Sequence, residues 1–134
     1  MPLCDPAVAY EDPFTRAPLH GPEGIAGRAR TLWAAFPDVR LNATGPRLAG
    51  ATHASAPAKL LGPHRAPLAG LAATGREVTV HVVCFAELRD GRFLRVRAFF
   101  DAYDAGVQLG VLPRPGTLGG RALLVLRGFG ARLA

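Results

Sequence analysis

Asp101 is the residue of this sequence that is best suited to acid–base chemistry. It directly follows a β-branched and aromatic run over 93–100 that is typical of a strand. A carboxylate in apolar surroundings has a raised pKa, which favours the exchange of protons near neutral pH. The alternative is that Asp101 only caps a short helix that follows it, although Asp104 is better placed for that capping role. We predict Asp101 as a catalytic acid/base and keep the capping role open.

Two further polar side chains, Arg97 and His64, could bind an oxygen of a substrate. Arg97 lies four residues before Asp101, so the two share one face of a strand. It could pair with Asp101 or bind an anionic or carbonyl oxygen, or it could be a rim arginine whose stem covers apolar surface. His64, in a Gly-Pro-His-Arg segment, is the histidine that we place near a site. No histidine or cysteine spacing indicates a metal site.

The strands that must position Asp101 form a predicted hairpin. Asp90-Gly91 stands between the apolar runs 78–85 and 93–100, and Asp-Gly in this setting is a strong hairpin signal. Counting outward from a two-residue turn gives a register with the pairs Arg89–Arg92, Cys84–Arg97, Val82–Phe99 and Val80–Asp101. This register places Val82 and Phe99 on the face that carries Asp101, where we expect them to line a pocket.

The other face of the predicted hairpin is apolar as well. It contains His81, which we interpret as a core or interface histidine, and the apolar residues Val83, Phe85, Val96, Ala98 and Phe100. An apolar face of this size exceeds what monomers usually expose. We therefore predict a homodimer that forms through this convex face of the sheet.

Helices are predicted on both sides of the strand region. Ile25, Ala29, Leu32, Trp33 and Phe36 fall on one helical face, so the spacing predicts an amphipathic helix over about 22–35. We expect Trp33 and Phe36 in the core, with Trp33 also lining a cavity. Extended stretches are predicted near 7–10, 39–48 and 51–61. A short helix is expected near 104–109 and a final helix from 118 to about 129, capped by Thr117.

Length, composition and charge narrow the class of protein. The chain has 134 residues, which suits a single domain over 1–134. The net charge is +6, but fifteen of the sixteen basic residues are Arg and they are spread along the chain without a block of like charge. We expect no nucleic-acid partner.

No apolar run approaches the roughly 20 residues that span a bilayer, so we also expect no membrane partner. No secretory signal is visible and the two cysteines suit a reducing compartment, so a cytoplasmic location is predicted.

Six short motifs follow one another in a distinctive order: Tyr10-Glu11-Asp12-Pro13, Gly21-Pro22-Glu23-Gly24-Ile25, Ala35-Phe36-Pro37-Asp38-Val39, Ala73-Thr74-Gly75-Arg76, Phe99-Phe100-Asp101 and Gln108-Leu109-Gly110. In order and spacing they resemble the SnoaL-like polyketide cyclases, which share the broader fold of nuclear transport factor 2 and ketosteroid isomerase. The resemblance covers about residues 8–112. Residues 113–134 form a C-terminal extension that we expect to be helical.

The resemblance implies an α+β fold, in which a strongly curved, mixed and largely antiparallel sheet forms a cone with helices on its concave face, a cystatin-like α+β barrel. It implies a homodimer through the outer sheet surface. In the cyclases, an Asp at the position of Asp101 removes a proton next to a carbonyl during an intramolecular aldol closure, and the bound polyketide delocalises the charge. The resemblance implies neither a metal nor an organic cofactor.

This sequence departs from the family pattern in three places. The family usually has a helix of several turns before the Tyr10 motif, and since only nine residues precede Tyr10 we expect that helix to be absent or shortened. The extension 113–134 is longer than the family needs, and could cover the pocket or pack on a partner. The segment around His64 reads Gly-Pro-His-Arg where relatives more often have Gly-Thr-His.

The predicted function is therefore that of a cofactor-free enzyme of the polyketide cyclase or isomerase type, acting on a small hydrophobic carbonyl compound. Asp101 is its predicted acid/base, and the predicted substrate-binding residues are Arg97, His64, Phe99, Trp33, Tyr10 and Val82. One alternative is a non-catalytic protein that binds a small hydrophobic ligand. Another is an epoxide hydrolase on the same fold, with an Asp-Arg-Asp arrangement to which Arg97 and Asp101 could contribute two members.

Overall fold

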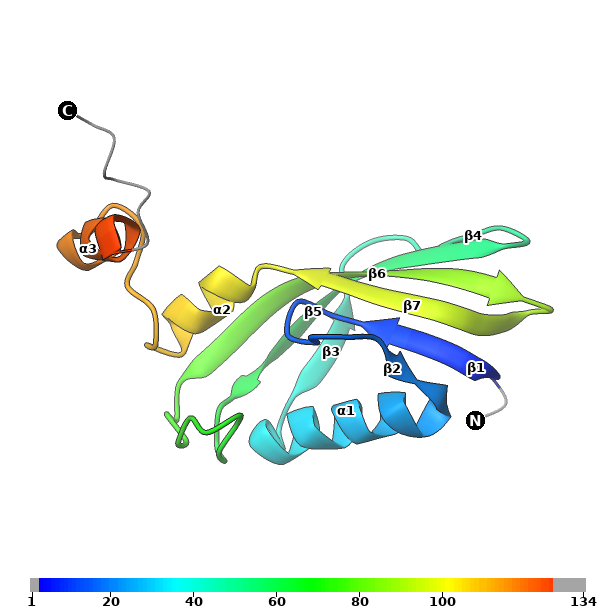
Figure 1. Ribbon diagram of the computed structural model, residues 1–134, viewed down its shortest axis with the longest axis horizontal. Helices are drawn as coiled ribbons and strands as arrows, with labels where there is room; N and C mark the ends of the chain where they lie inside the picture. The colour runs from blue at the N-terminus through cyan, green and yellow to red at the C-terminus, as the bar shows by residue number, and fades with distance from the viewer. Residues whose placement is uncertain (1–2, 127–134) are drawn as a thin grey trace.

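A curved sheet of seven strands dominates the computed structural model, which describes residues 3–126 (Figure 1). In chain order the elements are β1 (Cys4–Glu11), β2 (Leu19–His20), α1 (Gly21–Ala35), β3 (Arg40–Ala43), β4 (Leu48–Ala49), β5 (His53–Pro63), β6 (Glu77–Arg89), β7 (Arg92–Phe100), α2 (Ala102–Gln108) and α3 (Leu118–Leu126). None of the helices within 3–126 combines the length and the apolar character that a membrane crossing requires.

The sheet is mixed and largely antiparallel, as predicted. Its strand order is β2-β1-β7-β6-β5-β3, and β4 adds a short pairing to β5. Among the strands within residues 3–126, only β1 and β7 run parallel to each other. The sheet curves without closing into a barrel, and α1 lies along its concave side (Figure 1). The predicted fold class is therefore confirmed in its curved α+β architecture.

The hairpin between β6 and β7 begins as predicted but continues in a different register. Asp90 and Gly91 form the turn with φ angles of 50° and 72°, the positive values that a two-residue type I′ turn requires. Arg89 pairs with Arg92, but the register then shifts by one residue at a bulge next to Leu94. Further along, the observed pairs are Phe85–Arg97, Cys84–Ala98, Val83–Phe99 and Val82–Phe100. The predicted pairs Cys84–Arg97, Val82–Phe99 and Val80–Asp101 are wrong.

This one-residue shift exchanges the two faces of β7. Because side chains alternate along a strand, Val96, Ala98 and Phe100 now share the concave face with Val82. Arg97 and Phe99 share the convex face with Phe85 and Val83. The physical reason is burial: the regular register would turn the Arg97 guanidinium toward the concave core and leave Ala98 and Phe100 outside, which is unfavourable for a charged group.

The convex face predicted from the sequence is therefore partly wrong. Val83 and Phe85 are on it and are exposed, but Val96, Ala98 and Phe100 point to the concave side. Phe99 takes their place and is 55% exposed. His81 is exposed on this convex face, so the core interpretation of this histidine is wrong and the interface interpretation stays a prediction.

The main core cluster fills one end of the concave side. Ala35 and Phe36 from the end of α1 pack with Val78 of β6, and the partly buried residues around them are Leu32, Val39, Leu68, Val80 and Leu109. Gln108 of α2 binds both backbone groups of Thr79: its amide oxygen accepts from the Thr79 N–H at 2.7 Å and its amide nitrogen donates to the carbonyl at 2.8 Å. These bonds fix α2 against β6.

The prediction for α1 is correct in its bounds and for Phe36 but wrong for Trp33. The helix covers Gly21–Ala35, with Pro22 in its first turn, and Phe36 is buried. Trp33 is 56% exposed. It follows Leu32 by one residue, which turns its side chain about 100° around the helix, away from the face that packs on the sheet.

The C-terminal helix α3 stands apart from the sheet in Figure 1. Its first turn is capped as predicted, because the Thr117 hydroxyl accepts from the backbone N–H of Gly120 at 3.1 Å. Leu118 is 85% exposed on this helix. The rest of the predicted helix, from 127 to about 129, lies outside the described residues.

Candidate functional site

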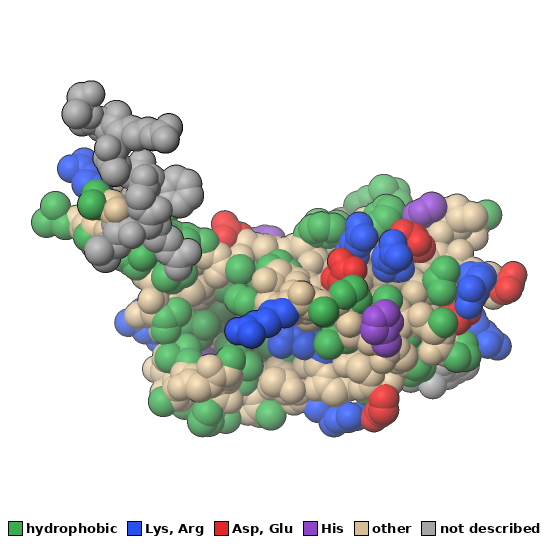
Figure 2. Space-filling view, in the orientation of Figure 1, with side chains coloured by type: hydrophobic (Ala, Val, Ile, Leu, Met, Phe, Trp, Pro, Cys, Tyr) green, Lys and Arg blue, Asp and Glu red, His purple; other side chains and the backbone are tan. Residues whose placement is uncertain are grey.

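The concave face of the sheet is the face on which α1 lies. The part of this face that α1 leaves uncovered is an apolar groove, and small side chains form its floor. Pairing between β5 and β6 places three alanines of β5 beside the concave residues of β6, in the pairs Ala54–Ala86, Ala56–Cys84 and Ala58–Val82. Ala98 adds another small side chain from β7. Figure 2 shows a hollow with hydrophobic side chains on this side of the molecule. Small side chains leave room for a ligand that is largely apolar.

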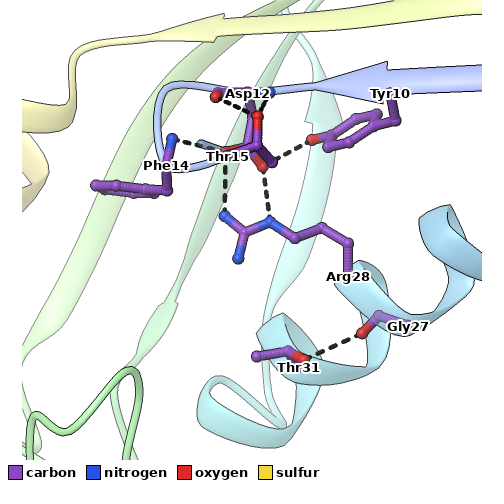
Figure 3. A network of polar contacts seen from close by, with 7 residues as sticks. All are labelled: Tyr10, Asp12, Phe14, Thr15, Gly27, Arg28 and Thr31. Carbon is purple, nitrogen blue, oxygen red and sulfur yellow. Dashed lines mark hydrogen bonds and ion pairs between the residues drawn. The ribbon is translucent and has the colours of Figure 1, made fainter. Parts of the chain in front are cut away.

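A polar network joins the turn after β1 to α1, the helix on the concave side of the sheet (Figure 3). Asp12, in the turn after β1, has a side chain that is only 3% exposed, and Arg28 of α1 binds it through two hydrogen bonds of 2.7 and 3.2 Å. The Tyr10 hydroxyl donates to Asp12 Oδ2 at 3.1 Å, and the backbone N–H of Phe14 donates to Oδ1 at 2.8 Å. Asp12 is thus saturated with donors, which suits a positioning residue better than a base.

These contacts set the charge states in the network. Burial raises the pKa of the Asp12 carboxyl, but hydrogen bonds from Arg28 and from the Phe14 amide outweigh this effect and hold the pKa below its ordinary value. Burial and the neighbouring Asp12 carboxylate raise the pKa of the Tyr10 phenol. Near neutral pH, Asp12 is therefore ionised and Tyr10 is a protonated hydrogen-bond donor.

The lowered pKa of Asp12 predicts a loss of stability in acid. The folded state holds this proton less tightly than the unfolded chain, so the ion pair stabilises the fold above the ordinary Asp pKa of about 3.9. That contribution is lost as pH falls through the lower, folded-state pKa. Chemical denaturation between pH 2 and 7 should show a weaker acid dependence for Asp12→Asn than for wild type. Asp38→Asn, which removes an exposed ion pair with Arg65, is the control, and an equal change in both variants would contradict the prediction.

An aromatic contact links the turn that contains Asp12 to the residue that precedes Asp101. The rings of Phe14 and Phe100 lie 5.4 Å apart between centroids. Phe14 belongs to the turn that Asp12 organises, and Phe100 directly precedes Asp101. The polar network and Asp101 therefore approach the same end of β7 from two sides.

Asp101 itself is exposed and caps α2. Its Oδ1 accepts from the backbone N–H of Asp104 at 2.9 Å, so Asp101 and not Asp104 is the N-cap. Within residues 3–126, no hydrogen-bond donor reaches its second oxygen, Oδ2. We expected a covered cavity beside Asp101, near Phe99 and Val82, but neither of the two cavities described next is lined by Asp101 or Val82. One cavity of about 230 Å³ is lined by Glu11, Asp12, Pro13, Arg97, Ala98 and Phe99. Another, of about 550 Å³, lies between β4, β5 and Phe85.

Two of the predicted substrate-binding residues point away from the groove. Arg97 lies on the convex face, where its Nε is 3.5 Å from Glu11 Oε2. Phe99 is exposed on the same face. The bulge in β7 causes both placements. The Asp-Arg-Asp arrangement of the epoxide hydrolase alternative also loses its basis, since Arg97 pairs with Glu11 and not with Asp101.

His64 is fully buried and holds a loop. Its Nδ1 accepts from the backbone N–H of Thr74 at 3.2 Å, and its ring lies 5.1 Å from that of Phe36. The Thr74 hydroxyl is 3.1 Å from the same nitrogen. His64 thus packs beside the core cluster and not beside the network of Asp12. Val82 and Tyr10, by contrast, lie on the groove side, and Trp33 is on the outer part of α1.

Asp12 and Arg28 are site residues that we did not predict from the sequence. A signal for Arg28 was present, because it falls three residues after Ile25 and four before Leu32, on the apolar face of α1. A charged residue on such a face needs a buried partner. The partner is sixteen residues earlier in the chain, and no local pattern connects the two.

No group of three or more His, Cys, Asp or Glu side chains in the described part of the chain is placed to hold a metal ion.

Comparison with known proteins agrees with the fold and identifies the family. The family model of SnoaL-like polyketide cyclases matches residues 2–109. No curated protein matches the chain. A candidate SnoaL-like polyketide cyclase from Jannaschia sp. CCS1 has a similar structure, with a TM-score of 0.74, 19% identity, and coverage of 84% of this chain and 76% of that one.

Two further structures are similar. IdmH, a candidate polyketide cyclase from Streptomyces antibioticus, has a TM-score of 0.67 and 23% identity over 82% of this chain and 84% of its own. A protein with a ketosteroid isomerase-like fold from Catenulispora acidiphila DSM 44928, in complex with trimethylamine, has a TM-score of 0.66 and 17% identity over 82% of this chain and 78% of its own. With the family model covering most of its length, the chain belongs to the family of SnoaL-like polyketide cyclases.

Proposed function

We propose that this protein is a cofactor-free enzyme that binds a small hydrophobic carbonyl compound in the concave groove and moves a proton next to the carbonyl. The observation that carries this proposal is the combination of an apolar groove with small side chains and a carboxylate, Asp101, that directly follows β7 and is held by the first turn of α2. Family membership supports the reaction type, because ring closure by polyketide cyclases begins with such a proton transfer.

Asp101 is the proposed acid/base. Its capping role and a catalytic role are compatible, since one carboxylate oxygen accepts from the Asp104 N–H and the other has no partner in the described chain. Capping fixes the carboxylate, which reduces the reorganisation that proton transfer requires. In the proposed step the C–H bond next to the carbonyl breaks and its proton goes to Oδ2. The electron pair moves to the carbonyl oxygen, and the carbon of the resulting enolate forms a C–C bond with a second carbonyl carbon of the same molecule. The π bond of that second carbonyl breaks, and its oxygen takes the proton back from Asp101.

Val82 and Tyr10 are the proposed contacts of the apolar part of the substrate. Val82 is buried on the groove floor, and Tyr10 lies on the groove side of β1 beside Val96. The Tyr10 hydroxyl is used by Asp12, so its ring is the part that faces a ligand.

A non-catalytic ligand-binding protein is the second candidate function. The observation in its favour is the exposure of Asp101, since a proton-transfer group usually works in a site from which water is excluded. The same groove would then bind a hydrophobic molecule without converting it.

Deuterium exchange tests the proposed function and separates it from the second candidate. The probe is 2-tetralone, a bicyclic ketone, in deuterated water, and proton NMR follows the loss of the signal next to the carbonyl. Catalysis should accelerate this exchange over the rate in buffer, in proportion to protein concentration. Line broadening that shows binding, without faster exchange across a panel of such ketones, would reject the enzyme and favour the binding protein.

We also propose that the protein is a homodimer and that it is located in the cytoplasm. Val83, Phe85 and Phe99 form an exposed apolar patch on the convex face, hereafter the convex patch. Charged pairs flank it, Arg95 with Glu87 and Arg97 with Glu11, so both signs of charge are present. An apolar patch flanked by both signs of charge supports an interface between two copies related by a two-fold axis, because each charge then has an opposite charge to pair with. Two free cysteines, Cys4 and Cys84, suit a reducing compartment.

A further inference from the structure

We propose that Arg28 binds the carbonyl oxygen of the substrate and stabilises the negative charge that develops on this oxygen during proton transfer. The proposal deepens the function proposed above and rests on it. It also assigns to the protein a task that the family resemblance leaves to the bound polyketide itself, the stabilisation of the enolate.

The guanidinium of Arg28 has one edge in use and one edge free. Nε and Nη2 donate to the two oxygens of Asp12. An arginine carries five N–H donors, so both donors of Nη1 and one of Nη2 remain, and no acceptor for them lies within the described residues. The Arg28 side chain is 24% exposed while that of Asp12 is 3% exposed. Figure 3 shows the unbonded nitrogen of the guanidinium on the side that points away from Asp12.

The contacts of Asp12 hold this free edge in place before a substrate arrives. Asp12 is fixed by the Phe14 amide and the Tyr10 hydroxyl, and its own backbone N–H donates to the Thr15 hydroxyl at 3.0 Å. Donors that are already oriented need little reorganisation when charge develops, which is the basis of oxyanion stabilisation. Tyr10 and Asp12 are thus positioning residues for Arg28.

The charge balance indicates what kind of oxygen this edge binds. Asp12 already neutralises Arg28, so the pair attracts a permanent anion less than an isolated arginine does. An oxygen that is neutral in the ground state and becomes negative during the reaction gains more from the donors in the transition state than before it. A carbonyl oxygen that becomes an enolate has this property.

The location of Arg28 is also consistent with one substrate molecule that contacts both Arg28 and Asp101. The contact between Phe14 and Phe100 joins the turn of Asp12 to the end of β7, where Asp101 follows. A molecule in the groove would have its carbonyl oxygen toward Arg28 and the neighbouring C–H bond toward Asp101. The proton then goes to Asp101, the electron pair of the broken bond goes to the oxygen, and Arg28 donates to the enolate.

A binding experiment that does not depend on turnover tests this assignment. The probes are 2-naphthol, whose ionised form resembles an enolate, and 2-methylnaphthalene, which has the same shape without the oxygen. Absorption spectra give the fraction of bound 2-naphthol that is ionised, and isothermal titration calorimetry gives the affinity of each probe. Arg28→Gln should reduce the affinity for the naphtholate about tenfold or more, the scale of one charge-assisted contact, and leave that for 2-methylnaphthalene unchanged.

Arg30→Gln is the matched control. Arg30 lies on the same helix and pairs with Glu23 on the surface, so the variant loses the same charge without touching the network. It should bind both probes as wild type does. Arg28→Gln leaves the buried Asp12 carboxylate with fewer hydrogen-bond donors, which destabilises the fold. Arg28→Lys therefore serves as a second variant, because it keeps the positive charge but cannot form the bidentate hydrogen bonds of an arginine. It should give an intermediate loss for naphtholate.

Three results would overturn the assignment: wild type that does not favour the ionised form of 2-naphthol, equal losses for both probes, or equal losses in Arg28→Gln and Arg30→Gln. Failure of the proposed function is a different result. If naphtholate binding depends on Arg28 while no ketone exchanges deuterium in the presence of the protein, the proposed catalysis is wrong and the oxygen-binding role of Arg28 stands.

Discussion

Asp101→Asn should reduce the rate of deuterium exchange into 2-tetralone by about a hundredfold or more, the usual scale for a positioned proton-transfer group. Asn has the same shape as Asp but no basic oxygen at neutral pH. Asn is also a good N-cap, so the hydrogen bond to the Asp104 amide and the stability of α2 should persist. Thermal unfolding and affinity for 2-methylnaphthalene should therefore change little while the exchange rate falls.

Asp104→Asn is the matched control for this prediction. Asp104 lies one turn further along α2, where its Oδ2 accepts from Gln108 at 2.6 Å. The control removes a carboxylate of the same helix and should leave the exchange rate within about threefold of wild type, below the range of a proton-transfer group. Wild-type exchange in Asp101→Asn would reduce Asp101 to a helix cap. Equal losses in both variants would point to the charge of α2 and not to one base.

Phe99→Glu should convert the proposed dimer into monomers. Phe99 is the most exposed member of the convex patch, and burial of a Phe side chain contributes about 2–3 kcal/mol. In a symmetric dimer the change occurs in both protomers, and each introduced carboxylate would be buried against apolar surface. We expect the dissociation constant to rise by at least about a hundredfold, measured by analytical ultracentrifugation over a concentration series.

Phe100→Glu separates this interface from the fold. Phe100 is next in the chain but faces the groove, where it packs against Phe14. Its replacement should lower the free energy of unfolding and weaken probe binding, with dissociation following only from loss of fold. Wild type that is monomeric at micromolar concentration would contradict the proposed dimer. Dissociation by Phe100→Glu in a fully folded protein, with Phe99→Glu still dimeric, would contradict the observed register.

The sequence by itself determined the local elements and the family. The apolar spacing from Ile25 to Phe36 predicts α1 because helix periodicity is a property of neighbouring residues, and the observed helix covers Gly21–Ala35. Asp90-Gly91 predicts the hairpin turn because few other residues tolerate its positive φ angles. The order of short motifs indicates the SnoaL-like family, whose model matches residues 2–109.

Register and exposure depended on the tertiary structure. A turn fixes strand pairing only until the first irregularity, and the bulge at Leu94 moves every later residue of β7 to the opposite face. Arg97 and Phe99 left the predicted site for this reason. Trp33 fits the apolar pattern of α1, but whether a side chain at the edge of that pattern is covered depends on what packs there, and here the ring is exposed.

The polar network was also decided by the tertiary structure alone. Asp12 and Arg28 are sixteen residues apart, in a turn and a helix, and meet because α1 packs beside β1. Sequence patterns reveal an unusual residue, such as a charge on the apolar face of α1, but they do not identify its partner. Pairing of this kind arises from the burial of two charges that must compensate each other, and only the packed chain selects which two these are.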